Sequence, residues 1–216
     1  YILIYLILFI LIFKKISEIY ENFHTDLKIG IFVISVPDDH VINDKPDWES
    51  NNIDGKIYSE RFLKEKELWK KYMNLHPNFK VHFLECNRKC SKTDSFNSEC
   101  IDCDESYLTG IYEKTYLAYQ EYNNYDIYIR TNLSTFYIFD KIYEELKKLP
   151  KNRPIYTGAS HVQPRYGTKW NISNFTYSFG TLIVMNKMAR NLFVDYGKAY
   201  IGIREADDIL ISKIFY

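Results

Sequence analysis

The sequence has no excess of either charge, and this absence excludes one broad class of function. Its 216 residues include 28 Lys and Arg and 28 Asp and Glu, so the formal net charge is zero. A protein dedicated to nucleic-acid binding carries a basic excess that neutralises phosphates. Internal repeats and Gly- or Ser-rich linkers are also absent, and only 8 residues are glycine. Residues 27–216 are therefore expected to form one domain.

The common sequence signatures of catalysis are missing too. The chain has no phosphate-binding loop, no glycine fingerprint of dinucleotide-binding domains, and no HExxH, GxSxG or kinase motif. The missing phosphate loop argues against a phosphotransferase. The five histidines are scattered without the spacing of metal ligands: His24, His40, His76, His82 and His161. Candidate chemistry therefore has to be sought among polar residues at the ends of predicted strands.

The longest apolar run lies at the N-terminus and is shorter than a membrane span. Residues 1–13 (YILIYLILFILIF) carry no charge and precede Lys14 and Lys15, whereas a transmembrane helix needs about 20 apolar residues. Because the chain starts with Tyr rather than Met, we interpret residues 1–26 as a truncated signal anchor and a short stem. A cleaved signal peptide and a core helix are the alternatives. The anchor predicts a single-pass type II membrane protein with a luminal domain.

Cysteine is scarce, and all four cysteines fall within one short segment. Cys86, Cys90, Cys100 and Cys103 form a C-x3-C and a C-x2-C pair. An oxidising lumen favours two disulfides, paired thiolates at this spacing are also typical of structural zinc, and free thiols are the third alternative. A catalytic cysteine is not expected, because no histidine neighbours them in sequence to activate a thiolate.

Apolar strand-like runs alternate with amphipathic helical segments along the chain. Strands are predicted at 27–36, 80–85, 125–130, 154–158 and 179–186, and helices at 59–76, 106–122, 135–149, 187–197 and 205–215. This alternation predicts an α/β fold with a parallel or mixed central sheet that helices cover on both faces. Ligands of such sheets bind beyond the carboxyl ends of the strands, so the loops at 36–40, 130–135 and 157–179 are expected to line a site.

Two segments have more candidate binding or catalytic side chains than their surroundings. The segment YDIYIRTNLSTF (125–136) ends a predicted strand with Arg130, Asn132 and Ser134. Asp207 and Asp208 stand in the first turn of the last predicted helix, where carboxylates can simply complement the helix dipole. The alternative is that one of them is a general base for a sugar hydroxyl.

The chain also contains glycosylation sequons at Asn132, Asn171 and Asn174, usable in a lumen. A glycan at Asn132 would obstruct the proposed site, so this sequon is expected to stay unmodified.

Five segments occur in an order that points to one family. They are VISVP at the end of the first strand, RFLKEKELW with Arg61, Lys66 and Trp69, ESYLTGIYEKT with Glu105 and Lys114, SFGTLIVMN with Ser178 and Gly180, and ADDILIS with Asp207 and Asp208. Together they resemble the β-1,3-glycosyltransferases of the galactosyltransferase and Fringe type. The resemblance covers roughly residues 27–216.

This resemblance implies a GT-A fold, with a Rossmann-like central mixed sheet flanked by helices. It also implies transfer of a sugar, with inversion, from a nucleotide-sugar (UDP-sugar) donor to a glycan or protein acceptor. Asp208 falls on the position of the catalytic base and Asp207 on the acidic residue beside it. The residues expected to bind substrate are Arg61, Lys66, Lys114, Arg130, Asn132, Ser134, Ser178 and Gly180.

One departure from the family affects its metal site. Where the family has Lys-x-Asp-Asp-Asp, whose aspartates hold Mn²⁺, this chain has Arg130 at the Lys and Asn132, Leu133 and Ser134 at the aspartates. Neutral oxygens are poor ligands for a hard cation, so affinity for Mn²⁺ is expected to fall steeply.

Three alternatives follow from this departure. In the first alternative, cations such as Arg130, Lys114 or Arg61 neutralise the charge of the diphosphate. In the second, a metal ion binds weakly and is held through the substrate. In the third alternative the protein is a catalytically inactive, membrane-anchored binding or structural protein that kept the fold.

Overall fold

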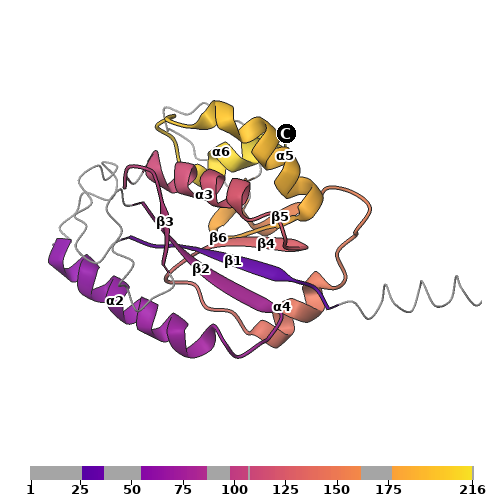
Figure 1. Ribbon diagram of the computed structural model, residues 1–216, viewed down its shortest axis with the longest axis horizontal. Helices are drawn as coiled ribbons and strands as arrows, with labels where there is room; N and C mark the ends of the chain where they lie inside the picture. The colour runs from indigo at the N-terminus through magenta and orange to yellow at the C-terminus, as the bar shows by residue number, and fades with distance from the viewer. Residues whose placement is uncertain (1–25, 37–54, 87–97, 107, 162–176, 216) are drawn as a thin grey trace, which may run out of the picture.

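The computed structural model describes residues 26–36, 55–86, 98–106, 108–161 and 177–215. In this part of the chain a six-stranded mixed sheet has the order β3-β2-β1-β4-β6-β5, with helices on both of its faces (Figure 1). The strands are β1 (Ile29–Ile34), β2 (Phe79–Cys86), β3 (Ser98–Ile101), β4 (Ile127–Asn132), β5 (Tyr156–His161) and β6 (Tyr177–Asn186). The helices are α2 (Gly55–Tyr72), α3 (Gly110–Glu121), α4 (Phe139–Leu146), α5 (Lys187–Gly197) and α6 (Asp207–Lys213), with a 3-10 turn at Lys198–Tyr200.

The sheet is parallel on one side and antiparallel on the other. β1 pairs in parallel with both β2 and β4, so that Ile34 lies opposite Leu84 on one side and Asn132 on the other. β3 continues the parallel part beyond β2, whereas β6 runs antiparallel to β4 and to β5. The predicted mixed α/β sheet is therefore confirmed.

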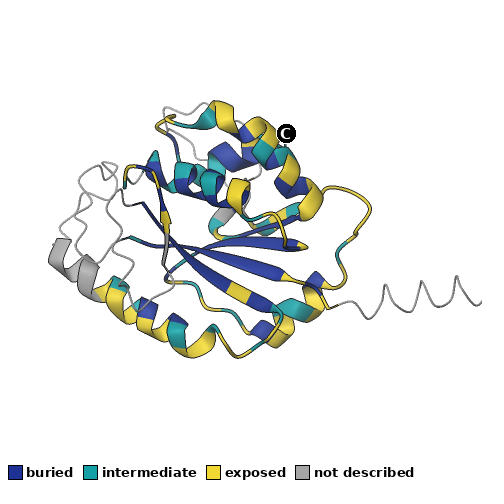
Figure 2. Ribbon diagram, in the orientation of Figure 1, coloured by how far each residue is buried: buried dark blue, intermediate teal, exposed yellow. Residues whose placement is uncertain are grey.

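Two hydrophobic cores lie on the two faces of the sheet (Figures 1 and 2). On one face, Phe32 of β1 packs with residues of α3, α5 and α6. On the other, Ile31 packs with Trp69 of α2 and Phe139 of α4. Every residue of β1 is buried, because successive side chains enter opposite cores, and this explains its continuous apolar sequence.

Most predicted elements are present with shifted ends. α5 has the predicted bounds, but the helix expected at 135–149 begins only at Phe139. The preceding residues instead cross the sheet face, where the Trp69 indole N–H donates to the carbonyl of Leu133 at 2.8 Å and the Tyr137 hydroxyl donates to Thr131 at 2.6 Å. The sequence did not predict β3, which is short, lies at the sheet edge and falls in the polar cysteine segment.

Several expectations concern parts of the chain outside the described residues. These include the anchor segment up to residue 25, most of the loops at 36–40 and 157–179, and the sequons at Asn171 and Asn174. Within the described residues, no helix has the length and apolarity needed to cross a membrane. The anchor stays a prediction.

Candidate functional site

The candidate site lies where the direction of the strand order reverses. From β1 the chain proceeds to β2 and then β3 on one side, and it returns to place β4 on the other side of β1. Ligands of open α/β sheets bind beyond the carboxyl ends of the strands at such a point. Here these ends are marked by Ser35 and Val36 after β1 and by Asn132 at the end of β4.

Two buried lysines reach the end of β1 from opposite faces of the sheet. Lys66 of α2 is 2% exposed, and its Nζ donates to the carbonyl of Val36 at 2.9 Å and lies 2.7 Å from Glu85 Oε1. Lys114 of α3 donates to the carbonyl of Ser35 at 2.7 Å and pairs with Glu105. Burial lowers the pKa of Lys114, and the charge and hydrogen bond of Glu105 oppose that decrease. Both lysines are thus bound to the protein's own groups.

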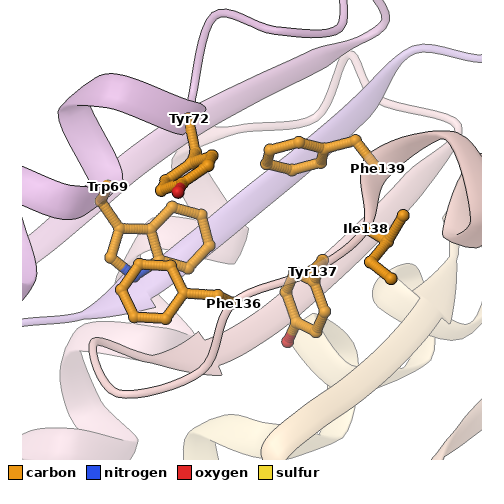
Figure 3. Close-up of a pocket in the computed structure, with 6 residues that line it drawn as sticks. All are labelled: Trp69, Tyr72, Phe136, Tyr137, Ile138 and Phe139. Carbon is orange, nitrogen blue, oxygen red and sulfur yellow. The ribbon is translucent and has the colours of Figure 1, made fainter.

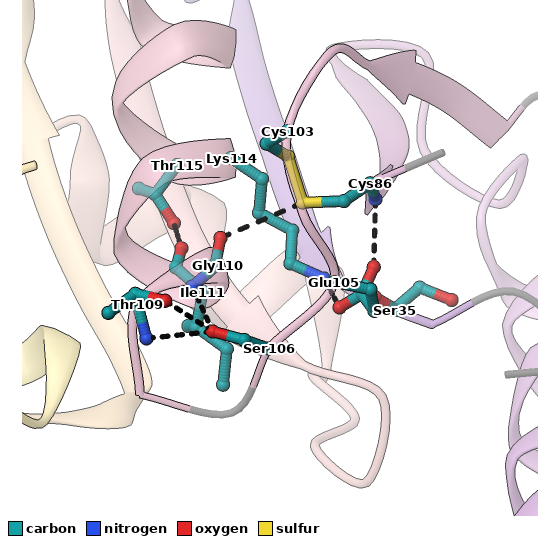
Figure 4. Close-up of a disulfide and its surroundings, with 10 residues drawn as sticks. All are labelled: Ser35, Cys86, Cys103, Glu105, Ser106, Thr109, Gly110, Ile111, Lys114 and Thr115. Carbon is teal, nitrogen blue, oxygen red and sulfur yellow. Dashed lines mark hydrogen bonds and ion pairs between the residues drawn. A yellow bond between two sulfur atoms is a disulfide. The ribbon is translucent and has the colours of Figure 1, made fainter. Parts of the chain in front are cut away.

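A disulfide supports the second of these lysines. Cys86, at the end of β2, is bonded to Cys103, and the backbone N–H of Cys86 donates to Glu105 Oε2 at 2.8 Å (Figure 4). Cys100 is disulfide-bonded as well, and none of the described cysteines is free. For these three cysteines the disulfide interpretation is confirmed, and zinc and free thiols are wrong. Cys90 lies outside the described residues.

The two acidic residues singled out in the sequence lie beside Arg130. Arg130 Nη2 is 2.5 Å from Asp207 Oδ2, although this oxygen lacks the alignment of a hydrogen bond, so the contact is an ion pair. Arg130 Nη1 donates to the carbonyl of Gly180, and the Gly180 N–H faces Asp208 Oδ2 at 3.3 Å. Residues 77 positions apart in sequence are therefore brought together by β4, β6 and the first turn of α6.

Asp208 has the properties of a weakly acidic carboxyl group held in place. Burial, followed by the charge of Asp207, raises its pKa from 3.8 to about 6, against the opposing effects of Arg130 and of the N–H groups of Gly180 and Ile209. The Ile209 N–H donates to Asp208 Oδ1 at 2.9 Å. At neutral pH such a group is mostly ionised and more basic than an ordinary aspartate, as a general base requires.

The other expected substrate-binding residues are distributed unevenly. Arg61 stands on α2 with a side chain 59% exposed and pairs with Glu65 at 2.8 Å. Asn132 is half-buried and Ser134 exposed in the turn after β4. Ser178 is buried, and its N–H donates to the Tyr156 hydroxyl at 3.4 Å. The structure thus assembles Arg130, Gly180, Asp207 and Asp208, while Lys66 and Lys114 form a neighbouring group.

Sequence reasoning missed Glu85 as a site residue. It is 4% exposed, accepts a hydrogen bond from the Ser35 hydroxyl at 2.8 Å and is the carboxylate beside Lys66. The available signal was a carboxylate that follows the apolar pair Phe83-Leu84 at the end of the strand segment FKVHFLEC, since a buried carboxylate requires a partner.

The turn after β4 does not provide the donors that Mn²⁺ prefers. Leu133 is buried, and its carbonyl accepts the Trp69 N–H. Asn132 and Ser134 add only neutral oxygens. Among the residues that the structure describes, no three His, Cys, Asp or Glu side chains gather as a metal-ligand set. The donors that this turn offers therefore do not fit Mn²⁺.

A separate aromatic cavity of about 240 Å³ lies between α2 and the segment before α4 (Figure 3). Its lining residues are Trp69, Tyr72, Phe136, Tyr137, Ile138 and Phe139. It lies on the face of α2 and α4, whereas Asp208 lies on the face of α3 and α6. None of its lining residues carries a charge.

Comparison of the sequence with models of known protein families finds no match, and comparison with curated proteins finds none either.

Proposed function

We propose that this protein is a glycosyltransferase that transfers a sugar from a nucleotide-sugar to a hydroxyl group of a glycan or protein, with Asp208 as general base. The observation that carries the proposal is the Asp208 carboxylate. It is half-buried, its pKa is raised to about 6, and it is held between the backbone N–H groups of Gly180 and Ile209. The motif resemblance, including a GT-A-like fold, supports the same function.

The proposed chemistry is a direct displacement. The acceptor hydroxyl gives its proton to Asp208 as its oxygen bonds to the anomeric carbon of the donor sugar. The bond between that carbon and the phosphate oxygen breaks, and its electron pair leaves with the nucleoside diphosphate. Attack opposite the leaving group inverts the anomeric centre. Asp207 is paired with Arg130 in this scheme and does not exchange the proton.

The buried charges at this edge of the sheet constrain how the diphosphate is held. Lys66, Lys114 and Arg130 are each paired with a carboxylate: Glu85, Glu105 and Asp207. With Asp208 also ionised, this set of residues carries one more negative than positive charge. A diphosphate would add to that excess, so its neutralisation by these three cations alone is disfavoured.

The same charge balance favours a second candidate function. A protein that kept the fold but binds a glycan or another protein without transferring sugar needs no free cation at this edge. The pairing of Lys66, Lys114 and Arg130 with carboxylates is the observation that favours this second candidate.

Donor turnover separates the two candidates. A panel of UDP-hexoses is incubated with the parent protein, with Asp208→Asn, and with Asp195→Asn as a matched control at an exposed aspartate of α5. The enzyme predicts release of UDP by the parent and the control, and loss of at least about 100-fold in Asp208→Asn. If the parent releases no UDP with any divalent cation and calorimetry detects no UDP binding, the enzyme is refuted and the non-catalytic binding protein is supported.

A further inference from the structure

We propose that Arg130 is a positioning residue that holds Asp208 through Gly180 and Asp207, and that it does not bind the donor diphosphate. The inference rests on the proposed function, in which Asp208 is the general base. It goes beyond that function because it assigns a role to a cation that the sequence pattern had placed among the substrate ligands.

The guanidinium group of Arg130 is directed entirely into the protein. Its side chain is 2% exposed, and its two terminal nitrogens contact the carbonyl of Gly180 and the carboxylate of Asp207. Its Nε is also buried and has no hydrogen-bond partner among the described residues. A diphosphate could reach this cation only by displacing Asp207 and Gly180.

Gly180 connects Arg130 to Asp208 through one residue of backbone. Its carbonyl accepts from Arg130 Nη1, and its N–H faces Asp208 Oδ2. Asp207 makes the second connection, because it pairs with Arg130 and precedes Asp208 in α6. These contacts close a ring of four residues, so a shift of the guanidinium changes both the donor to Asp208 and the charge beside it.

The absence of a side chain at Gly180 is a requirement of this arrangement. A Cβ atom added at this position would lie 2.2 Å from Arg130 Nη1 and 3.1 Å from its Cζ. Real Cβ atoms do not approach other atoms this closely, so alanine at position 180 would push the guanidinium group away. Substitution here therefore disturbs the position of Arg130 without removing its charge.

The charged and titratable groups around Asp208 come from several elements. Asp207 precedes it on α6, Arg130 faces it from β4, and the Tyr156 hydroxyl approaches from β5. Tyr112 of α3 lies near Asp207. Asp207 opposes the ionised form of Asp208, and Arg130 favours it. Removing the guanidinium therefore leaves two neighbouring carboxylates without the cation between them, and the pair should bind its first proton at higher pH.

A titration of the Asp208 carboxyl carbon by ¹³C NMR tests the proposal without any substrate. The protein is labelled at the aspartate carboxyl carbons, and Asp208→Asn assigns the resonance. Arg130→Gln is expected to raise the apparent pKa of Asp208 by about one pH unit, and Gly180→Ala should move it in the same direction. The matched control, Arg153→Gln, changes an exposed arginine and should leave the titration unchanged. UDP affinity, measured by calorimetry, should stay within about twofold in Arg130→Gln.

An unchanged titration of Asp208 in folded Arg130→Gln would overturn the proposal. So would a tenfold or greater loss of UDP affinity in this variant, which would identify a diphosphate ligand. If Arg130→Gln does not fold, the titration in Gly180→Ala decides alone. A raised pKa in protein that never turns over a UDP-sugar would retain the positioning role and refute the proposed enzyme. If turnover requires Asp208 but the titration of Asp208 is unchanged in Arg130→Gln, the proposed enzyme is retained and the positioning role is refuted.

Discussion

Replacing Asp208 with asparagine is expected to stabilise the folded protein near neutral pH, although it removes the proposed base. Burial beside Asp207 raises the pKa of Asp208 from 3.8 to about 6. A carboxyl group with a raised pKa binds more protons in the folded than in the unfolded state between these two values. Stability therefore falls as pH rises from about 4 to about 6, and the loss persists at higher pH.

The size of this effect follows from the same two pKa values. At about 1.4 kcal/mol per pKa unit, the rise from 3.8 to about 6 corresponds to a penalty of about 3 kcal/mol at pH 7. Asparagine removes the charge and keeps an acceptor for the Ile209 N–H, but it gives up the acceptor for Gly180, which costs about 1 kcal/mol. The free energy of unfolding should increase by about 1–2 kcal/mol at pH 7 and decrease by about 1 kcal/mol near pH 4.

Urea unfolding of the parent and of Asp208→Asn between pH 4 and pH 7, followed by tryptophan fluorescence, measures this difference. Asp195→Asn serves as the control and should change the free energy of unfolding by less than about 0.5 kcal/mol across this range. A stability difference for Asp208→Asn that is the same at pH 4 and pH 7 would refute the reasoning, because it would show that this carboxyl group titrates alike in both states.

Three further changes test the buried contacts around the site. Replacing Cys86 and Cys103 with alanine should lower the free energy of unfolding by about 3 kcal/mol, from a disulfide that spans 17 residues; equal urea midpoints would contradict this. Lys66→Met leaves Glu85 buried without its lysine and should cost about 3–5 kcal/mol, most of which the double variant with Glu85→Leu should recover in the same assay. Trp69→Phe removes one indole hydrogen bond and should cost about 1–3 kcal/mol; full stability of this variant would show that the bond contributes nothing.

The fold could be predicted from local patterns because its central strands have a distinctive composition. A strand buried on both faces is expected to be apolar throughout, and the β1 segment IGIFVI satisfies this before any tertiary contact is known. Helix α5 has the predicted bounds, and Asn186 caps its start by accepting from the Ala189 N–H at 3.0 Å. In contrast, β3 exists only because it pairs with β2. A polar edge strand has no local signal that distinguishes it from a loop.

The candidate site was predicted in part for a similar reason. Asp208 could be singled out by its position in a helix's first turn, and Arg130 by its position near a strand end. Both residues contact Gly180, and this depends on the antiparallel pairing of β4 with β6, in which Arg130 lies opposite Ile183. The pairing of Lys66 with Glu85 likewise depends on packing of α2 against the sheet. Such partners are specified by tertiary structure, and sequence spacing does not reveal them.

The dependence of donor turnover on pH tests the central role of Asp208 most directly. With a UDP-hexose that the parent protein turns over, kcat/KM is measured from pH 4.5 to pH 8 in the parent and in Asp208→Asn. The account predicts that the parent rate rises about tenfold per pH unit below about pH 6 and is level above it, because the base must be ionised. A rate that does not change over this range, or an Asp208→Asn variant with the parent's rate and profile, would contradict it.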